Sequence, residues 1–125
     1  MTAIKSVQNL DVWKEAVNLS VDVYNFTADF PSKELYGLAS QMQRAAISIP
    51  SNIAEGFERG SNAEFKRFLL IARGSISELQ TQLTIAEKLG YKGKQISGFE
   101  LYDKSVNIHK MLNGLLRHIR SKSSS

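Results

Sequence analysis

The side chains that could carry acid–base or metal chemistry are few in this chain and lie far apart. Its two histidines, His109 and His118, are nine residues apart with no acidic residue between them. Helical zinc and di-metal sites place glutamate and histidine within one turn of each other, as in HExxH and ExxH, and neither pattern occurs. The sequence therefore predicts no catalytic residue, no metal site and no cofactor.

Phosphate-binding and nucleophile motifs are missing as well. The segment from Gly56 to Gly60 has two glycines but lacks the GK[ST] ending of a P-loop. Gly74-Ser75 falls inside an expected helix with no strand before it, unlike a GxSxG nucleophile. The chain has no cysteine, which excludes disulfides and thiolate metal sites. These absences favour a protein that binds and assembles over an enzyme.

The residues best suited to binding are cations. The chain has sixteen lysines and arginines and twelve acidic residues, a net charge of +4. This charge permits a nucleic-acid partner without requiring one. No acidic residue follows Asp103, so the C-terminal end is basic and could attract phosphate. The alternative is a solvated helix face whose cations lie near the negative end of the helix dipole. The candidate nucleic-acid contacts are Arg44, Arg59, Lys66, Arg67, Arg73, Arg117 and Arg120.

Helices must position these side chains. Apolar residues recur at spacings of three and four, and no run alternates as a strand would. Helices are expected at about 11–28, 32–56, 61–89 and 97–120. Asp11 can cap the first, and Phe30-Pro31-Ser32 ends it. Ser61 with Glu64, and Ser97 with Glu100, have capping-box spacing at the starts of the last two.

Short loops between long helices favour antiparallel neighbours. The predicted fold class is all-α, an antiparallel up-and-down four-helix bundle. Residues 1–125 form a single domain, with frayed ends at about 1–8 and 121–125. Pro50 predicts a kink in the second helix, because proline has no N–H and its ring clashes with the carbonyl one turn back. A break followed by a short new helix is the alternative.

Two apolar runs are wider than one bundle face requires. Residues 68–72 are five consecutive apolar residues, and residues 45–49 are nearly so. Surplus apolar surface on a small protein indicates contact with another subunit, unless these two helices are simply central. The interface candidates are Ile47, Phe68, Leu70 and Ile71.

A polar stripe accompanies these runs on the second and third helices. Its members are spaced so that they share a helix face, and buried charges must be paired. They could form a binding network, or a set of ion pairs across the bundle or a subunit seam that fixes helix register. The network candidates are Gln41, Arg44, Ser48, Asn52, Glu55, Arg73 and Glu78.

The N-terminal ten residues contain no apolar run of signal-peptide length, and no segment reaches the length of a membrane span. A cytoplasmic protein without membrane contact is expected.

Several motifs carry a family resemblance. They include Leu10-Asp11-Val12-Trp13-Lys14, the string Ser48-Ile49-Pro50-Ser51-Asn52-Ile53-Ala54-Glu55-Gly56, and Arg73-Gly74-Ser75-x-x-Glu78-Leu79. The chain resembles, over about residues 8–118, the four-helix bundle proteins encoded in intervening sequences of bacterial 23S ribosomal RNA genes. One departure is Gln43, where an arginine beside Arg44 is expected.

The resemblance implies a closed bundle that assembles into a homopentameric ring. It extends to the accessory variability proteins of diversity-generating retroelements, basic pentamers that bind nucleic acid and a reverse transcriptase. The favoured hypothesis is an oligomeric module that binds structured RNA, or DNA, through cations repeated around the ring. The alternative is an adaptor that docks a partner protein, such as a reverse transcriptase.

Overall fold

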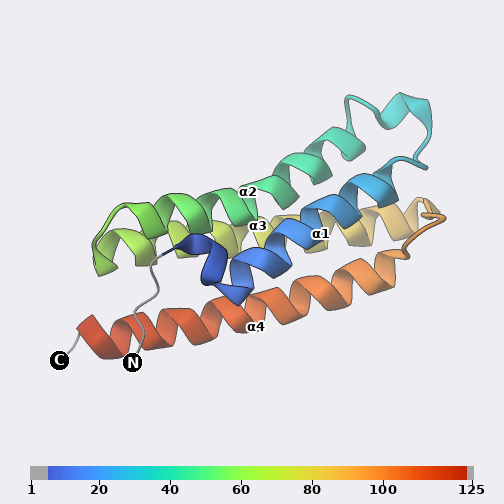
Figure 1. The fold of residues 1–125 in the computed structure, drawn as a ribbon. Helices are drawn as coiled ribbons and strands as arrows, with labels where there is room; N and C mark the ends of the chain where they lie inside the picture. The colour runs from blue at the N-terminus through green and yellow to red at the C-terminus, as the bar shows by residue number, and fades with distance from the viewer. Residues whose placement is uncertain (1–5, 124–125) are drawn as a thin grey trace.

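The computed structural model describes the backbone of residues 6–123 and the side chains of residues 6–119, and this part of the chain is helical without strands (Figure 1). This confirms the all-α bundle. The elements are the 3₁₀ turn η1 (Val7–Asn9), α1 (Asp11–Thr27), the 3₁₀ turn η2 (Ser32–Glu34), α2 (Leu38–Glu58), α3 (Asn62–Lys88) and α4 (Gly98–Ser123).

The described elements reach into both terminal segments for which fraying is predicted. Residues 7 and 8 belong to η1, and α4 continues through Ser123 instead of ending near residue 120. Residues 1–5 and 124–125 lie outside the described part of the chain.

The four helices form a closed ring of neighbours. In Figure 1 successive helices run in alternating directions, so α3 starts at the end of the bundle where α4 finishes. Both α1 and α3 pack against α2 and α4, and the α2–α3 contact is the most extensive. Each helix buries one apolar stripe along the common axis, as burial of nonpolar surface requires. The largest fully buried members are Leu19, Val23, Phe26, Met42, Ile49, Ile53, Leu69, Ile76, Leu79, Leu101, Ile108 and Leu112.

The predicted caps of α3 and α4 are present in part. The hydroxyl of Ser61 accepts from the Glu64 amide at 3.2 Å, and that of Ser97 accepts from the Glu100 amide at 3.1 Å. The carboxylate of Glu64, however, bonds Arg67 and not the backbone at Ser61. At α1, Leu10 holds the N-cap position without a side-chain bond, so Asp11 contributes as a first-turn acid.

The end of α3 is fixed by the glycine that the sequence indicates. Gly90 has φ 78°, the left-handed conformation that ends many helices. Its N–H donates to the Glu87 carbonyl at 2.9 Å, and the Tyr91 N–H donates to the Ala86 carbonyl at 3.0 Å. These two bonds form a Schellman motif, which turns the chain sharply into the α3–α4 connection.

The predicted helix at 32–56 is divided in the structure. Residues 32–34 form η2, and α2 begins only at Leu38. The Glu34 carboxylate accepts from the Leu38 N–H at 3.1 Å and so satisfies one of the free amides at the start of α2. Gly37, with φ −114° and ψ −117°, departs from helical geometry just before it. A side-chain bond and a glycine together set this boundary.

The α2 helix runs without a break through Pro50. Proline offers no N–H to the carbonyl of Ala46 one turn earlier, but the Ser20 hydroxyl of α1 lies 3.1 Å from that oxygen and donates to it. The alternative of two separate helices is therefore wrong, and the kink remains a prediction.

Candidate nucleic-acid interface

A cleft of about 140 Å³ lies between α3 and α4. Residues 66, 70 and 73 line it from α3, where spacings of four and three place them on one face. Residues 113, 116 and 117 line it from α4. Three of the seven predicted cations therefore converge on one site, namely Lys66, Arg73 and Arg117.

Among the side chains that the structure describes, no carboxylate forms an ion pair with the cations of this cleft. Arg73 donates through Nη1 to the neutral side-chain oxygen of Asn113 at 3.0 Å. Within residues 6–119, none of the ion pairs involves Lys66, Arg73 or Arg117. A phosphate oxygen entering the cleft would therefore meet lysine and arginine donors still able to form charge-assisted hydrogen bonds.

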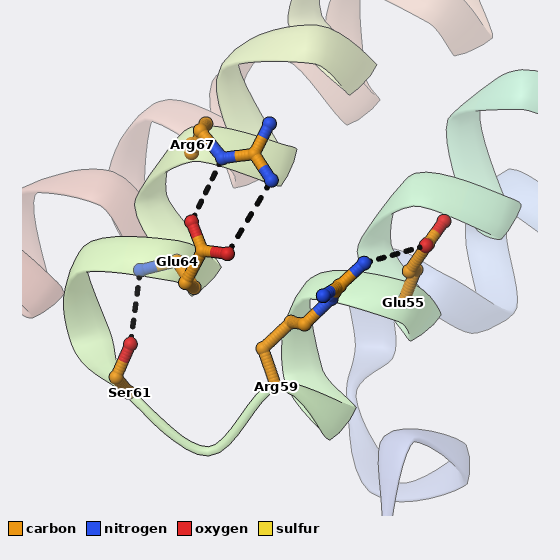
Figure 2. A network of polar contacts seen from close by, with 5 residues as sticks. All are labelled: Glu55, Arg59, Ser61, Glu64 and Arg67. Carbon is orange, nitrogen blue, oxygen red and sulfur yellow. Dashed lines mark hydrogen bonds and ion pairs between the residues drawn. The ribbon is translucent and has the colours of Figure 1, made fainter.

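Two other predicted cations are already paired at the α2–α3 turn, as Figure 2 shows. Arg59 Nη2 lies 3.1 Å from Glu55 Oε1, and Arg67 binds both oxygens of Glu64 at 2.8 and 3.3 Å. The Arg67 hydrogen bonds lower the pKa of Glu64, and Glu64 raises the pKa of Arg67. Both guanidiniums also lie over the Phe68 ring, 5.0 and 4.5 Å from its centroid. Arg59 and Arg67 are thus already engaged in local contacts next to this turn.

Of the remaining two cations, one lies outside the cleft and the other has a side chain outside the described residues. Arg44 is exposed on α2, a helix that contributes nothing to the cleft lining. Arg120 belongs to α4, but its side chain is outside the described residues.

The predicted charged network does not form between α2 and α3. Glu55 pairs within its own helix and Arg73 reaches α4. Gln41, Arg44 and Glu78 are exposed. These long polar and charged side chains extend into water, where they keep their hydration.

A small hydroxyl cluster replaces that network. Ser48 and Ser75 share a hydrogen bond of 2.8 Å across the α2–α3 contact, and Asn52 donates to the Ser48 hydroxyl at 2.9 Å. Ser75 was not predicted, although its position between the core residues Ala72 and Leu79 is the signal that could have identified it. Ser48 and Asn52 are the members of the predicted network that the structure brings together.

Three of the four predicted interface residues are exposed in the single chain. The exposed fractions are 42% for Ile47, 39% for Leu70 and 43% for Ile71. Phe68 is only 6% exposed, because it faces Gly56 of α2 and is covered by two arginines. Phe68 therefore belongs to the core of the bundle and offers little surface to another chain.

Gln43 has a structural contact of its own. Its Nε2 donates to the Thr27 hydroxyl of α1 at 3.0 Å. The side chain that departs from the family pattern thus faces α1, whereas Ser48 of the same helix faces Ser75 of α3.

Two general features of the described residues bear on function. They contain no group of three or more histidine, aspartate or glutamate side chains that could hold a metal ion. No helix in this part of the chain has the length and hydropathy needed to cross a bilayer.

Together, the closed ring of four helices and the cation-lined cleft define a small helical-bundle protein with a basic interhelical site. The chain belongs to the 23S rRNA-intervening sequence protein family, whose model matches residues 8–114. Its fold is shared with a crystal structure of a protein of unknown function from the S23 ribosomal protein family of Bacteroides thetaiotaomicron VPI-5482. The TM-score is 0.73 at 22% identity, over 85% of this chain and 95% of that one. No curated protein matches this chain in sequence.

Proposed function

We propose that this protein is a non-catalytic, cytoplasmic homo-oligomer, with five subunits expected, that binds structured RNA or other nucleic acid. The observation that carries the proposal is the convergence of Lys66, Arg73 and Arg117 on one cleft without an acidic partner among the described residues. Phosphate contacts dominate the affinity of proteins for nucleic acid, and lysine and arginine supply them.

Assembly strengthens such binding. A single cleft with three cations contacts few phosphates, but a ring repeats the cleft once per subunit on one particle. Contacts made by linked sites reinforce each other because the second is effectively intramolecular. Leu70, which is exposed, lies in the cleft between Lys66 and Arg73. A subunit contact that covered Leu70 would place the cleft beside the boundary between two chains.

The test is salt-dependent binding of a fluorescein-labelled RNA hairpin, followed by fluorescence anisotropy between about 50 and 200 mM salt. The variant Lys66→Gln/Arg73→Gln/Arg117→Gln should bind more weakly. The slope of log affinity against log salt should also become shallower, by about 0.7 to 0.9 for each phosphate that the variant no longer neutralises.

The control is Arg59→Gln/Arg67→Gln, which removes two cations where the test variant removes three. These two cations already pair with Glu55 and Glu64 and lie outside the cleft. Its affinity and salt slope should change much less. The proposal fails if the wild-type protein shows no RNA binding at about 50 mM salt, or if the two variants lose affinity equally.

A further inference from the structure

A second hollowed surface lies at the end of the bundle where α3 passes into α4. This end of the bundle is away from the described start of α1 and end of α4 (Figure 1). Two hollows of about 250 and 260 Å³ adjoin there and share Leu83, Glu87, Gly98 and Phe99 as lining residues. They form one groove along the α3–α4 seam. This groove, called the end groove below, shares no lining residue with the basic cleft.

Aromatic rings line the end groove. Phe99, in the first turn of α4, is 71% exposed and contacts both hollows. Tyr91 lines one hollow and Tyr102 the other. An apolar ring that remains this exposed in the folded chain contributes little to its core. Exposed aromatics beside a hollow are the type of residue that dominates binding energy at protein interfaces.

The wall formed by Tyr91 is held in place before any ligand arrives. Its hydroxyl donates to Glu34 Oε2 at 2.8 Å, and its ring lies 4.9 Å from that of Phe30. The Tyr91 hydrogen bond is the main cause of a lowered pKa at Glu34. A preformed wall reduces the entropy cost of binding.

The charges of the end groove favour a cation. Glu87 lines both hollows and Asp103 lines the second, whereas Lys92 is the one basic lining residue among those described. The negative pole of α3 at Lys88 and the positive pole of α4 at Gly98 both lie at this end of the bundle, so the helix dipoles largely offset each other and the carboxylates decide the sign of the charge. Aromatic faces also attract cations. Phosphate would be repelled by the carboxylates that line this groove.

We propose that the end groove binds an apolar segment of a partner protein that carries arginine or lysine. An apolar side chain of the partner enters the hollow against Leu83 and Phe99. The cationic group then pairs with Glu87 or Asp103 over the aromatic faces. Charge complementarity selects this occupant over nucleic acid, so the bundle carries a phosphate site and a separate protein-docking site.

The probe is a short amphipathic helical peptide with leucines spaced three and four apart and arginines between them. A matched peptide carries glutamate at every arginine position. Each is titrated to millimolar concentration into the isotope-labelled full-length protein, and amide shifts are followed by NMR. The arginine peptide should shift the amides of Glu87, Gly98 and Phe99, and the glutamate peptide should not.

Two variants test which side chains of the end groove contribute to peptide binding. Phe99→Ala removes an exposed ring without opening the core, and Glu87→Gln/Asp103→Asn removes the negative charge. Each should weaken binding of the arginine peptide by about tenfold or more, as loss of an interface anchor does. The control for the aromatic ring is Tyr36→Ala, which removes a side chain that is 92% exposed in the α1–α2 connection. The control for the charge is Glu58→Gln, at the last residue of α2. Both should leave binding unchanged.

Several results would overturn this proposal. One is the absence of shifts in the end groove at the highest peptide concentration, and another is equal binding of the two peptides. A lower particle mass for Phe99→Ala would assign the groove to a second copy of this chain. Loss of RNA binding in that variant would assign it to nucleic acid. Failure of the basic cleft to bind RNA would leave the peptide readouts unaffected.

Discussion

At the scale of single residues, Gly56 explains part of the most specific string in the sequence. It ends the run from Ser48 to Gly56 and is buried where α2 meets α3. A Cβ at this position would lie 2.6 Å from the Phe68 Cβ and 3.2 Å from a ring carbon of Phe65. The first distance is well below van der Waals contact, so the two helices can approach this closely only with glycine here.

Replacement of Gly56 by alanine should therefore destabilise the bundle. Helix propensity alone favours alanine by about 0.5–1 kcal/mol. Overpacking against Phe68 should outweigh this and produce a net loss of about 1–3 kcal/mol. Urea unfolding of the wild-type and variant proteins measures the difference.

Gly74 supplies the control, because it also lies within a helix but nothing is within 4 Å of the Cβ it would gain. Gly74→Ala should stabilise the protein by about 0.5–1 kcal/mol. If both substitutions stabilised it alike, the close contact at Gly56 would have no energetic weight.

At the scale of elements, α2 depends on its neighbour α1 to pass through a proline. The carbonyl of Ala46 cannot accept from residue 50, and the Ser20 hydroxyl donates to it instead. The same hydroxyl lies 3.0 Å from the Ala16 carbonyl, so its single proton is shared between α1 and α2. A side chain of α1 thus supplies the hydrogen bond that the backbone of α2 lacks at Pro50.

This account predicts coupling between Ser20 and Pro50. Ser20→Ala should cost about 1 kcal/mol in the wild-type background, because the Ala46 carbonyl then has no donor. In a Pro50→Ala background the new N–H of residue 50 can donate to that carbonyl, so the same substitution should cost less. A double-mutant cycle by urea unfolding measures the difference. Equal costs in both backgrounds would show that the hydroxyl does not serve the proline.

The helices were predictable because their signals are local. The three-and-four spacing located all four, Ser61 and Ser97 marked two starts, and Gly90 marked an end. The start of α2 was not predictable from spacing. It depends on the Glu34 carboxylate binding the Leu38 amide, and apolar periodicity carries no information about such a bond.

The site was less predictable than the fold. The sequence supplied seven cations, but the register between α3 and α4 decides that Lys66, Arg73 and Arg117 meet. Asn113, which holds Arg73, gave no signal except its spacing of four from Arg117. Pairing across the bundle is a tertiary property, and for that reason the spacing along each helix did not show that Glu55 pairs within α2 or that Arg73 bonds Asn113 of α4.

At the scale of the whole molecule, the two ends of the bundle carry different chemistry. The basic cleft lies toward the end where α3 starts and α4 finishes (Figure 1). The end groove, with Glu87 and Phe99, lies at the other end. An oligomer that left both ends accessible would join its subunits along the sides of the helices, where Ile47, Leu70 and Ile71 are exposed.

Ile71→Glu tests that assembly more cleanly than Leu70→Glu, because Leu70 also lines the basic cleft and a carboxylate there would repel phosphate as well. At a packed apolar seam, the carboxylate would have to lose its hydration without a partner, and the complex should dissociate. On the surface of a monomer the same change should leave the fold intact. Light scattering after size exclusion should therefore show several subunits for wild type and one for Ile71→Glu, with helical content unchanged.

Tyr36→Glu, in the α1–α2 connection at the far end, should keep the wild-type mass. A wild-type protein with the mass of one chain, or an Ile71→Glu variant with an unaltered oligomer mass, would show that Ile71 does not lie between subunits.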